Sequence, residues 1–194
     1  SYVRVEIEAG TLNSRASLRG PLSDGSGSWL LSARGWYPEA VLDTIELGGG
    51  ERVDPYFSDA YGKASFIVSP RTIYSIHALS SYDRVSFQEN DLKEPEGNES
   101  ANAITRNNYA WFRLLSNPSS RWLTESTLSA GRIERNRHGV SVPQDTRSEV
   151  TDNRQADFFG LKHTSTWRVN SNNALRGGAD LRWLTAKYRY EMRV

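Results

Sequence analysis

The chain alternates apolar and polar side chains at every second position along most of its 194 residues. In the first segment, Val3, Val5 and Ile7 alternate with Arg4 and Glu6. Successive side chains of a β-strand point to opposite faces, so this period of two predicts strands with one apolar and one polar face. Helix-period patterning is nearly absent. We therefore predict an all-β chain.

Nine segments carry the alternation. They lie near residues 3–9, 15–19, 29–34, 59–68, 74–83, 107–116, 121–135, 156–169 and 175–190. In the fourth and fifth segments, the predicted apolar face holds Ala64, Phe66, Ile76 and Ala78, and the predicted polar face holds Lys63, Ser65, Ser75 and His77. Which of these two faces points toward water is the question that decides the function.

The connections between these segments are of two kinds. Short turns rich in Gly, Pro, Asn, Asp and Ser occur at residues 24–27, 69–72, 117–120 and 170–173. Long irregular stretches occur at residues 38–56, 89–105 and 138–153. The two kinds alternate from the second strand onward, although the connection at residues 10–13 is short where a long one is due. This order predicts an antiparallel up-and-down meander, with the turns at one rim and the loops at the other.

The polar face is rich in long charged side chains. The candidates to line an interior are Arg15, Arg19, Arg34, Lys63, His77, Arg176, Asp180 and Arg182. An interior that holds them needs room and water, whereas the apolar face, with many Ala, Gly and Ser residues, is too thin to fill a large core. We therefore predict that the apolar face contacts lipid and that the chain is a partial transmembrane β-barrel.

Aromatic residues support this orientation. Three tryptophans lie next to short turns on the apolar face of their strands, namely Trp29, Trp122 and Trp167. Three other aromatic residues lie toward the opposite strand ends, namely Tyr37, Tyr82 and Trp183. The two interfacial girdles of a membrane barrel would produce this distribution. The alternative is that they are ordinary strand aromatics.

Composition excludes several classes of function. The net charge of +1 gives no indication of a nucleic-acid partner, and the lack of cysteine excludes disulfides and thiolate metal sites. The three histidines, His77, His138 and His163, do not have the spacing of a metal site, and we expect neither a metal nor a cofactor. No apolar run of 18 residues exists, which excludes a membrane-spanning helix.

Three further features have both a functional and a simpler interpretation. His77 shares the polar face with Asp83, which is compatible with an acid–base pair in a hydrolase, but a solvated histidine is favoured. The glycines at residues 48–50 lack the following Lys-Ser/Thr of a phosphate loop, so we predict a loop tip. Residues 89–99 hold five acidic side chains, which would repel anions or hold cations, although a merely soluble loop is favoured.

Two stretches resemble the barrel of TonB-dependent outer-membrane receptors. Residues 18–43 (LRGPLSDGSGSWLLSARGWYPEAVLD) are similar to the early barrel of that family, where a strand ending in Gly-Pro turns through a glycine-rich link into a strand ending in Ala-Arg and an aromatic residue. Residues 54–83 are similar to the family's recurrent unit of strand, Ser/Thr-Pro-Arg turn and strand. The resemblance implies a barrel of about twenty-two strands in the outer membrane of a Gram-negative bacterium. It also implies a plug domain, and uptake of iron chelates, cobalamin or glycans with energy delivered through TonB.

The sequence departs from this family in three ways, because it has no plug, no TonB-contacting box and no terminal strand that ends in an aromatic residue. Nine is also an odd number of strands for a bacterial barrel, which is normally even. We therefore expect residues 1–194 to be the early part of a receptor barrel that serves uptake without catalysis. In the intact receptor, Arg15, Arg19 and Arg34 would meet the plug; the alternative is that they pair with carboxylates of the lumen.

Two other functions stay open at this point. One is a self-contained small outer-membrane barrel, acting as a pore or a surface hydrolase. The other is a soluble β-barrel or sandwich that binds small molecules in its interior. The identity of any transported ligand does not follow from the sequence.

Overall fold

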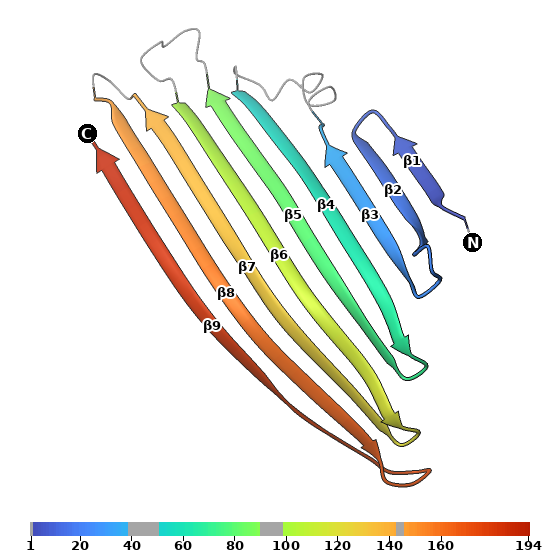
Figure 1. Ribbon diagram of the computed structural model, residues 1–194. Helices are drawn as coiled ribbons and strands as arrows, with labels where there is room; N and C mark the ends of the chain where they lie inside the picture. Colours follow the sequence, from blue (N-terminus) through green and yellow to red (C-terminus); the bar gives the residue numbers. More distant parts are fainter. Residues whose placement is uncertain (1, 39–50, 90–98, 143–145) are drawn as a thin grey trace.

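The computed structural model describes residues 2–38, 51–89, 99–142 and 146–194, which form one antiparallel sheet of nine strands (Figure 1). The strands are β1 (Arg4–Ala9), β2 (Asn13–Pro21), β3 (Gly27–Trp36), β4 (Glu51–Ser69), β5 (Thr72–Glu89), β6 (Glu99–Ser119), β7 (Trp122–Ser141), β8 (Ser148–Arg168) and β9 (Ala174–Arg193). They follow one another in the sheet in chain order. The all-β class, the nine strands and the meander are thereby confirmed. No helix long and apolar enough to cross a membrane occurs in these ranges.

Tight turns join the strands at one rim of the sheet, and the longer connections lie at the other, as predicted (Figure 1). We call them the turn rim and the upper rim. The β2–β3 turn contains Gly25, whose φ of 72° favours glycine. Beside it, Asp24 accepts hydrogen bonds from the backbone N–H and the hydroxyl of Ser26, at 2.9 and 2.6 Å. This local bonding lets the chain reverse direction within a few residues.

The strands continue further toward the upper rim than the sequence pattern predicted. Residues 51–56, 99–105, 138–141 and 148–153, which were predicted to be loop, are parts of β4, β6, β7 and β8. Here the alternation continues with its phase reversed: Asn102 lies opposite Ser86 and His138 on the apolar face, whereas Ala101 lies opposite Phe87 and Gly139 on the polar face. Residues 39–50, 90–98 and 143–145 lie outside the described residues, and with them the glycine run and most of the acidic stretch.

The register separates the sheet into the two predicted faces. Ile76 of β5 lies opposite Phe112 of β6, and the next residue, His77, lies opposite Trp111. On the other side of β5, Ala64 of β4 lies opposite Ile76. The predicted apolar and polar sets of β4 and β5 therefore do lie on opposite faces, which we call the apolar face and the polar face.

Burial is inverted relative to a water-soluble sheet. No described hydrophobic residue is buried, and the buried polar residues are Ser17, Ser75, His77 and Asp152. All four lie on the polar face. Because the sheet is curved (Figure 1) and side chains crowd together on a concave surface, this burial makes the polar face the inner, concave one.

The sheet is open along both edges in the described part of the chain. β1 pairs only with β2, and β9 pairs only with β8. The two edge strands both run toward the upper rim, and they differ in length, with 6 residues in β1 and 20 in β9 (Figure 1). The described sheet is thus a partial barrel wall, as predicted.

Candidate functional site

All eight side chains predicted to line an interior lie on the polar face, but they form two separate groups. The first lies on β2 to β5 and consists of Arg15, Arg19, Arg34, Lys63 and His77. The second lies on β9 and consists of Arg176, Asp180 and Arg182. β6, β7 and β8 lie between the groups. The sheet thus does not bring the eight together into one site, and their position along a lumen stays a prediction.

Within the second group, Asp180 and Arg182 neutralise each other's charge. Arg182 donates hydrogen bonds to the two carboxylate oxygens of Asp180 at 3.0 and 2.9 Å. The residues are two apart on β9, so both side chains lie on the same face of the strand. This pair is complete in itself and needs no partner.

The first group begins with an ion-paired cluster at the edge of the sheet. Arg4 of β1 lies opposite Arg19 of β2, and Glu6 lies beside both. Arg19 Nη2 is 2.9 Å and Arg4 Nε is 3.9 Å from Glu6 Oε1, and the hydroxyl of Ser17 is 3.4 Å from Glu6 Oε2. One carboxylate therefore serves two arginines.

Further toward the upper rim, the polar face is hollowed. A cavity of about 810 Å³ lies over β1 to β5, and its lining includes Glu8, Arg15, Arg34, Trp36, Phe57 and Asp59. Arg34 is fixed on two sides, because Asp59 accepts a hydrogen bond from its Nε and its guanidinium lies 5.1 Å from the centre of the Phe57 ring. Both contacts hold the guanidinium plane at a defined angle.

A row of four charges crosses this cavity from strand to strand. Glu8 lies opposite Arg15, Arg15 opposite Arg34, and Arg34 opposite Asp59. The last two form the ion pair described above, whereas no ion pair or hydrogen bond joins Glu8 to Arg15 within the described ranges. Arg15 and Arg34 thus face each other across β2 and β3, with Glu8 and Asp59 as the outer members of the row.

A second cluster on the polar face is built around His77. Its Nδ1 is 2.7 Å from the hydroxyl of Tyr61 on β4, and its Nε2 is 2.8 Å from the hydroxyl of Ser75 on β5. The imidazole stacks on the indole of Trp111 on β6, with ring centres 4.7 Å apart and planes 10° apart. His77 is only 8% exposed. The prediction of a solvated histidine is therefore wrong, because rings from both neighbouring strands cover it.

The alternative considered for His77, a pairing with Asp83, is not formed either. Asp83 is six residues further along β5, roughly 20 Å away at the rise of a strand, and lies opposite Phe57 and Thr105. Two of the partners that His77 does have, Tyr61 and Trp111, are on other strands. Only the register of the sheet shows that these residues lie beside His77, and the alternation of the sequence does not predict the register.

The His77 cluster lacks two parts that a hydrolase needs. A histidine that activates a serine is normally oriented by a third group such as a carboxylate, and here the second ring nitrogen is bonded to the hydroxyl of Tyr61. Acyl transfer also uses free N–H donors for the oxyanion, whereas β4, β5 and β6 pair continuously at this level. The geometry instead favours a fixed, partly apolar surface.

A further aromatic contact extends this surface across the sheet. Tyr109 of β6 and Phe158 of β8 lie on either side of Gly131 of β7, and their ring centres are 5.8 Å apart. A Cβ atom at Gly131 would be 2.5 Å from the Phe158 ring and 2.6 Å from the Tyr109 ring. The glycine is therefore required for the two rings to close over the strand between them.

The apolar face carries its large side chains in an exposed belt next to the turn rim. Phe159 and Trp183 mark its upper boundary, with ring centres 5.7 Å apart. At the turn rim, Trp122 lies opposite Trp167, and its Nε1 donates a hydrogen bond of 2.6 Å to Ser165. The distance from Leu175 to Trp183 on β9 is eight residue steps, or about 26 Å along the strand and about 20 Å at the usual tilt.

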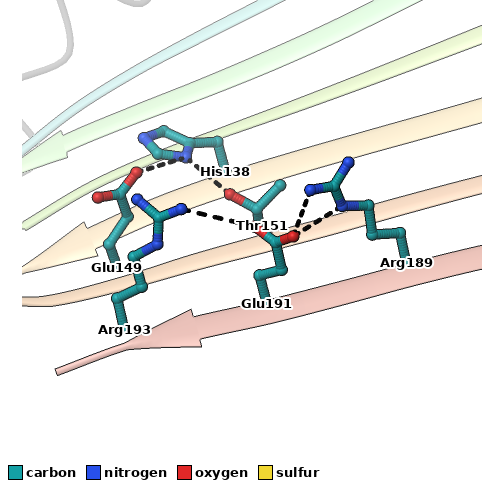
Figure 2. A network of polar contacts seen from close by, with 6 residues as sticks. All are labelled: His138, Glu149, Thr151, Arg189, Glu191 and Arg193. Carbon is teal, nitrogen blue, oxygen red and sulfur yellow. Dashed lines mark hydrogen bonds and ion pairs between the residues drawn. The ribbon is translucent and has the colours of Figure 1, made fainter.

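Above this belt, the apolar face changes to ion pairs. Arg132 Nε is 2.6 Å from Asp157 Oδ1, immediately above Ala130 and Phe159. Near the upper rim, β7, β8 and β9 contribute a polar network of His138, Glu149, Thr151, Arg189, Glu191 and Arg193 (Figure 2). Glu191 lies at its centre, where it accepts a hydrogen bond of 2.7 Å from Arg189 Nε. This hydrogen bond holds the pKa of Glu191 below its usual value.

No cluster of three metal-ligating His, Cys, Asp or Glu side chains is found among the described residues. Comparison with known proteins identifies no relative: no family model matches the chain, no curated protein is similar to it, and no solved structure matches it.

Proposed function

We propose that this chain contributes the early strands of the transmembrane β-barrel of a TonB-dependent outer-membrane receptor, which takes up a scarce ligand. The observation that carries the proposal is the inverted distribution of polarity over the curved sheet. The convex face exposes Ile76 at 51%, Phe159 at 47% and Leu181 at 51%, while all buried polar residues lie on the concave face. An exposed apolar belt of this extent requires a cover, and a lipid bilayer is the cover that suits a closed ring of strands.

The proposed barrel has more strands than the nine described. β1 and β9 run in the same direction, so pairing them with each other would give a parallel contact in an antiparallel barrel. An up-and-down barrel therefore needs an odd number of further strands. The resemblance implies a barrel of about twenty-two strands, so about thirteen strands would be added to the nine described ones. Thirteen is odd, as this condition requires. A wide barrel also leaves room for water around the arginines of the concave face.

The uptake function rests on the resemblance of residues 18–43 and 54–83 to receptor barrels. In this proposal, the concave face lines a lumen that is filled by a plug domain of the same receptor, and TonB supplies the energy. The protein would act in transport rather than catalysis, in the outer membrane of a Gram-negative bacterium.

Single cysteines test which face is wet, because the chain has no cysteine of its own. In the full-length protein in outer membranes, Lys63→Cys should react with a water-soluble, charged thiol reagent, and Ala78→Cys should react only with a lipid-soluble one. These positions lie on neighbouring strands, on opposite faces and within one residue of the same level, which makes them a matched pair. Labelling of Ala78→Cys by the charged reagent, with Lys63→Cys protected, would reverse the proposed orientation.

A second measurement tests the coupling to TonB separately. The full-length protein in detergent should bind the purified periplasmic domain of TonB. If the labelling result holds but no TonB binding is found, the chain belongs to an outer-membrane barrel that is not a TonB-dependent receptor. A protein that stays monodisperse without detergent would contradict the membrane location itself.

A further inference from the structure

We infer that the hollow over β1 to β5 is a binding subsite for a small organic anion that carries a carboxylate next to a flat ring. The inference rests on the proposed function for its biological meaning, since it names the chemical class of the ligand that such a receptor would hold. The binding itself is a property of Arg15 and its surroundings. It can be measured without any assumption about transport.

The first argument is an arginine that forms no ion pair or hydrogen bond to any described residue. Like charges directly opposite each other on neighbouring strands destabilise a sheet. Arg4 and Arg19 are such a pair, and Glu6 compensates both of them. Arg15 and Arg34 are the next such pair along β2.

In the second pair, only one arginine is bonded. Asp59 is engaged by Arg34, and Arg15 has no ion pair or hydrogen bond to any described residue. Glu8 lies opposite Arg15 but does not bond to it. An anion placed at Arg15 would supply the hydrogen-bonded partner that this arginine lacks.

The second argument is the set of flat surfaces around that charge. Trp36 and Phe57 lie opposite each other on β3 and β4, two residues along from Arg34 and Asp59, and Tyr61 lies two residues along on the other side. All three rings line the same cavity as Arg15. Trp36 is 40% exposed, so much of its surface is open to contact. A carboxylate bonded in the fork of Arg15 would bring an attached ring toward these surfaces.

The cavity also has a suitable size and charge for this class of ligand. Its volume of about 810 Å³ falls in the range of small-molecule sites, which is roughly 300–1,000 Å³. The carboxylates of Glu8 and Asp59 are the outer members of the charged row and are separated by the two arginines. They therefore do not converge on a point where a cation would sit. The only charged group available at the centre of the row is Arg15.

Calorimetric titration of the full-length protein in detergent tests the subsite, with three probes. Benzoate has both the carboxylate and the ring, acetate has only the carboxylate, and benzyl alcohol has only the ring. We expect benzoate to bind more tightly than either of the other two. Arg15→Gln should weaken benzoate binding by about tenfold or more, because a charge-assisted contact is lost.

Two variants make the result specific. Arg4→Gln also removes a guanidinium from the polar face, but this guanidinium belongs to the ion-paired cluster at Glu6. This variant should leave benzoate binding unchanged. Glu8→Gln removes the carboxylate nearest to Arg15 without changing its size, and should tighten benzoate binding. This second variant also tests the subsite if Arg15→Gln fails to fold.

The inference is overturned if the wild-type protein shows no preference for benzoate, if Arg15→Gln binds it as tightly as wild type, or if Glu8→Gln has no effect. None of these outcomes changes the result expected from the labelling or the TonB-binding measurement. Conversely, benzoate binding at Arg15 in a protein that does not bind TonB would keep the subsite and remove the receptor assignment.

Discussion

Ile76 and His77 are neighbours on β5, yet the isoleucine is 51% exposed and the histidine 8% exposed. In a water-soluble sheet, the hydrophobic effect would place them the other way round. The two side chains belong to the same strand and the same hydrogen-bonded ladder, so the backbone does not cause the difference. What differs is the face on which each residue lies. The comparison teaches that the crowded concave face is built from polar and aromatic contacts, and that the open convex face exposes side chains that a water-soluble sheet would bury.

The strongest test of this comparison is a charge placed on each face. Ile76→Arg puts a guanidinium in the middle of the apolar belt, and we expect it to lower the stability of the assembled barrel by about 2–4 kcal/mol. Ser65→Arg, on the polar face opposite Ser28 and Ser75, should have a much smaller effect, because small polar residues surround it. Urea unfolding of the full-length protein in lipid vesicles measures both. Equal losses from the two variants would contradict the assignment of the faces.

The second test concerns crowding. Gly131→Ala puts a Cβ atom within 2.5 Å of the Phe158 ring on the concave face, so we expect a loss of about 1–3 kcal/mol. Gly177→Ala is the matched control, because nothing lies within 4 Å of its Cβ position on the convex side of β9. The same unfolding measurement should show little change for Gly177→Ala. Adding Phe158→Ala to Gly131→Ala should recover part of the loss, and a purely additive double variant would argue against the contact.

The third test compares two histidines on opposite faces. His77→Ala removes two hydrogen bonds and leaves the hydroxyls of Ser75 and Tyr61 without their partner, which should cost about 1–3 kcal/mol. His163→Ala removes one exposed contact with Ser126 on the convex face and should cost within about 0.5 kcal/mol. Thermal unfolding of the two variants in detergent separates these outcomes. A larger loss of stability from His163→Ala than from His77→Ala would contradict the proposed difference between the two faces.

The smallest effect concerns the polar network at the upper rim (Figure 2). Arg189 lowers the pKa of Glu191 in the folded protein, so the network contributes stability above the ordinary pKa of a glutamate and loses it as the pH falls through the lowered value. Acidification below about pH 4 should therefore lower the protection factors of amide hydrogens at the upper ends of β8 and β9. Amides next to the apolar belt should keep their protection factors. Glu191→Gln should remove the pH dependence, and its persistence in that variant would rule out Glu191 as the cause.

The period of two was sufficient to predict the class, the number of strands and the two faces, because side-chain alternation is a direct consequence of strand geometry. It failed near the upper rim, where the alternation reverses its phase: Asn102 lies opposite Ser86 on the convex face, and Ala101 lies opposite Phe87 on the polar face. A strand whose apolar residues change from one face to the other has no single apolar face to detect. The backbone ladder nevertheless continues through this change.

The candidate site was predictable only in part, for a related reason. The polarity of Arg15, Arg34 and His77 placed them on the correct face. Their partners come from neighbouring strands, and which residue lies opposite which depends on the register. Thus the sequence of a single strand could not predict that Trp111 stacks on His77, or that Arg15 has no bonded partner among the described residues.

Every strand of this sheet pairs with the strand next to it in the chain, and this has a consequence for how the wall forms. Each hairpin can be closed across a short stretch of chain, so the entropy lost in closing loops stays small at every step. Each finished strand then presents a full row of backbone donors and acceptors to the strand that follows it. The 20-residue edge of β9 is such a row, three times as long as that of β1. Within the described sheet, the six-residue ladder between β1 and β2 is therefore the shortest one and should be the first to open.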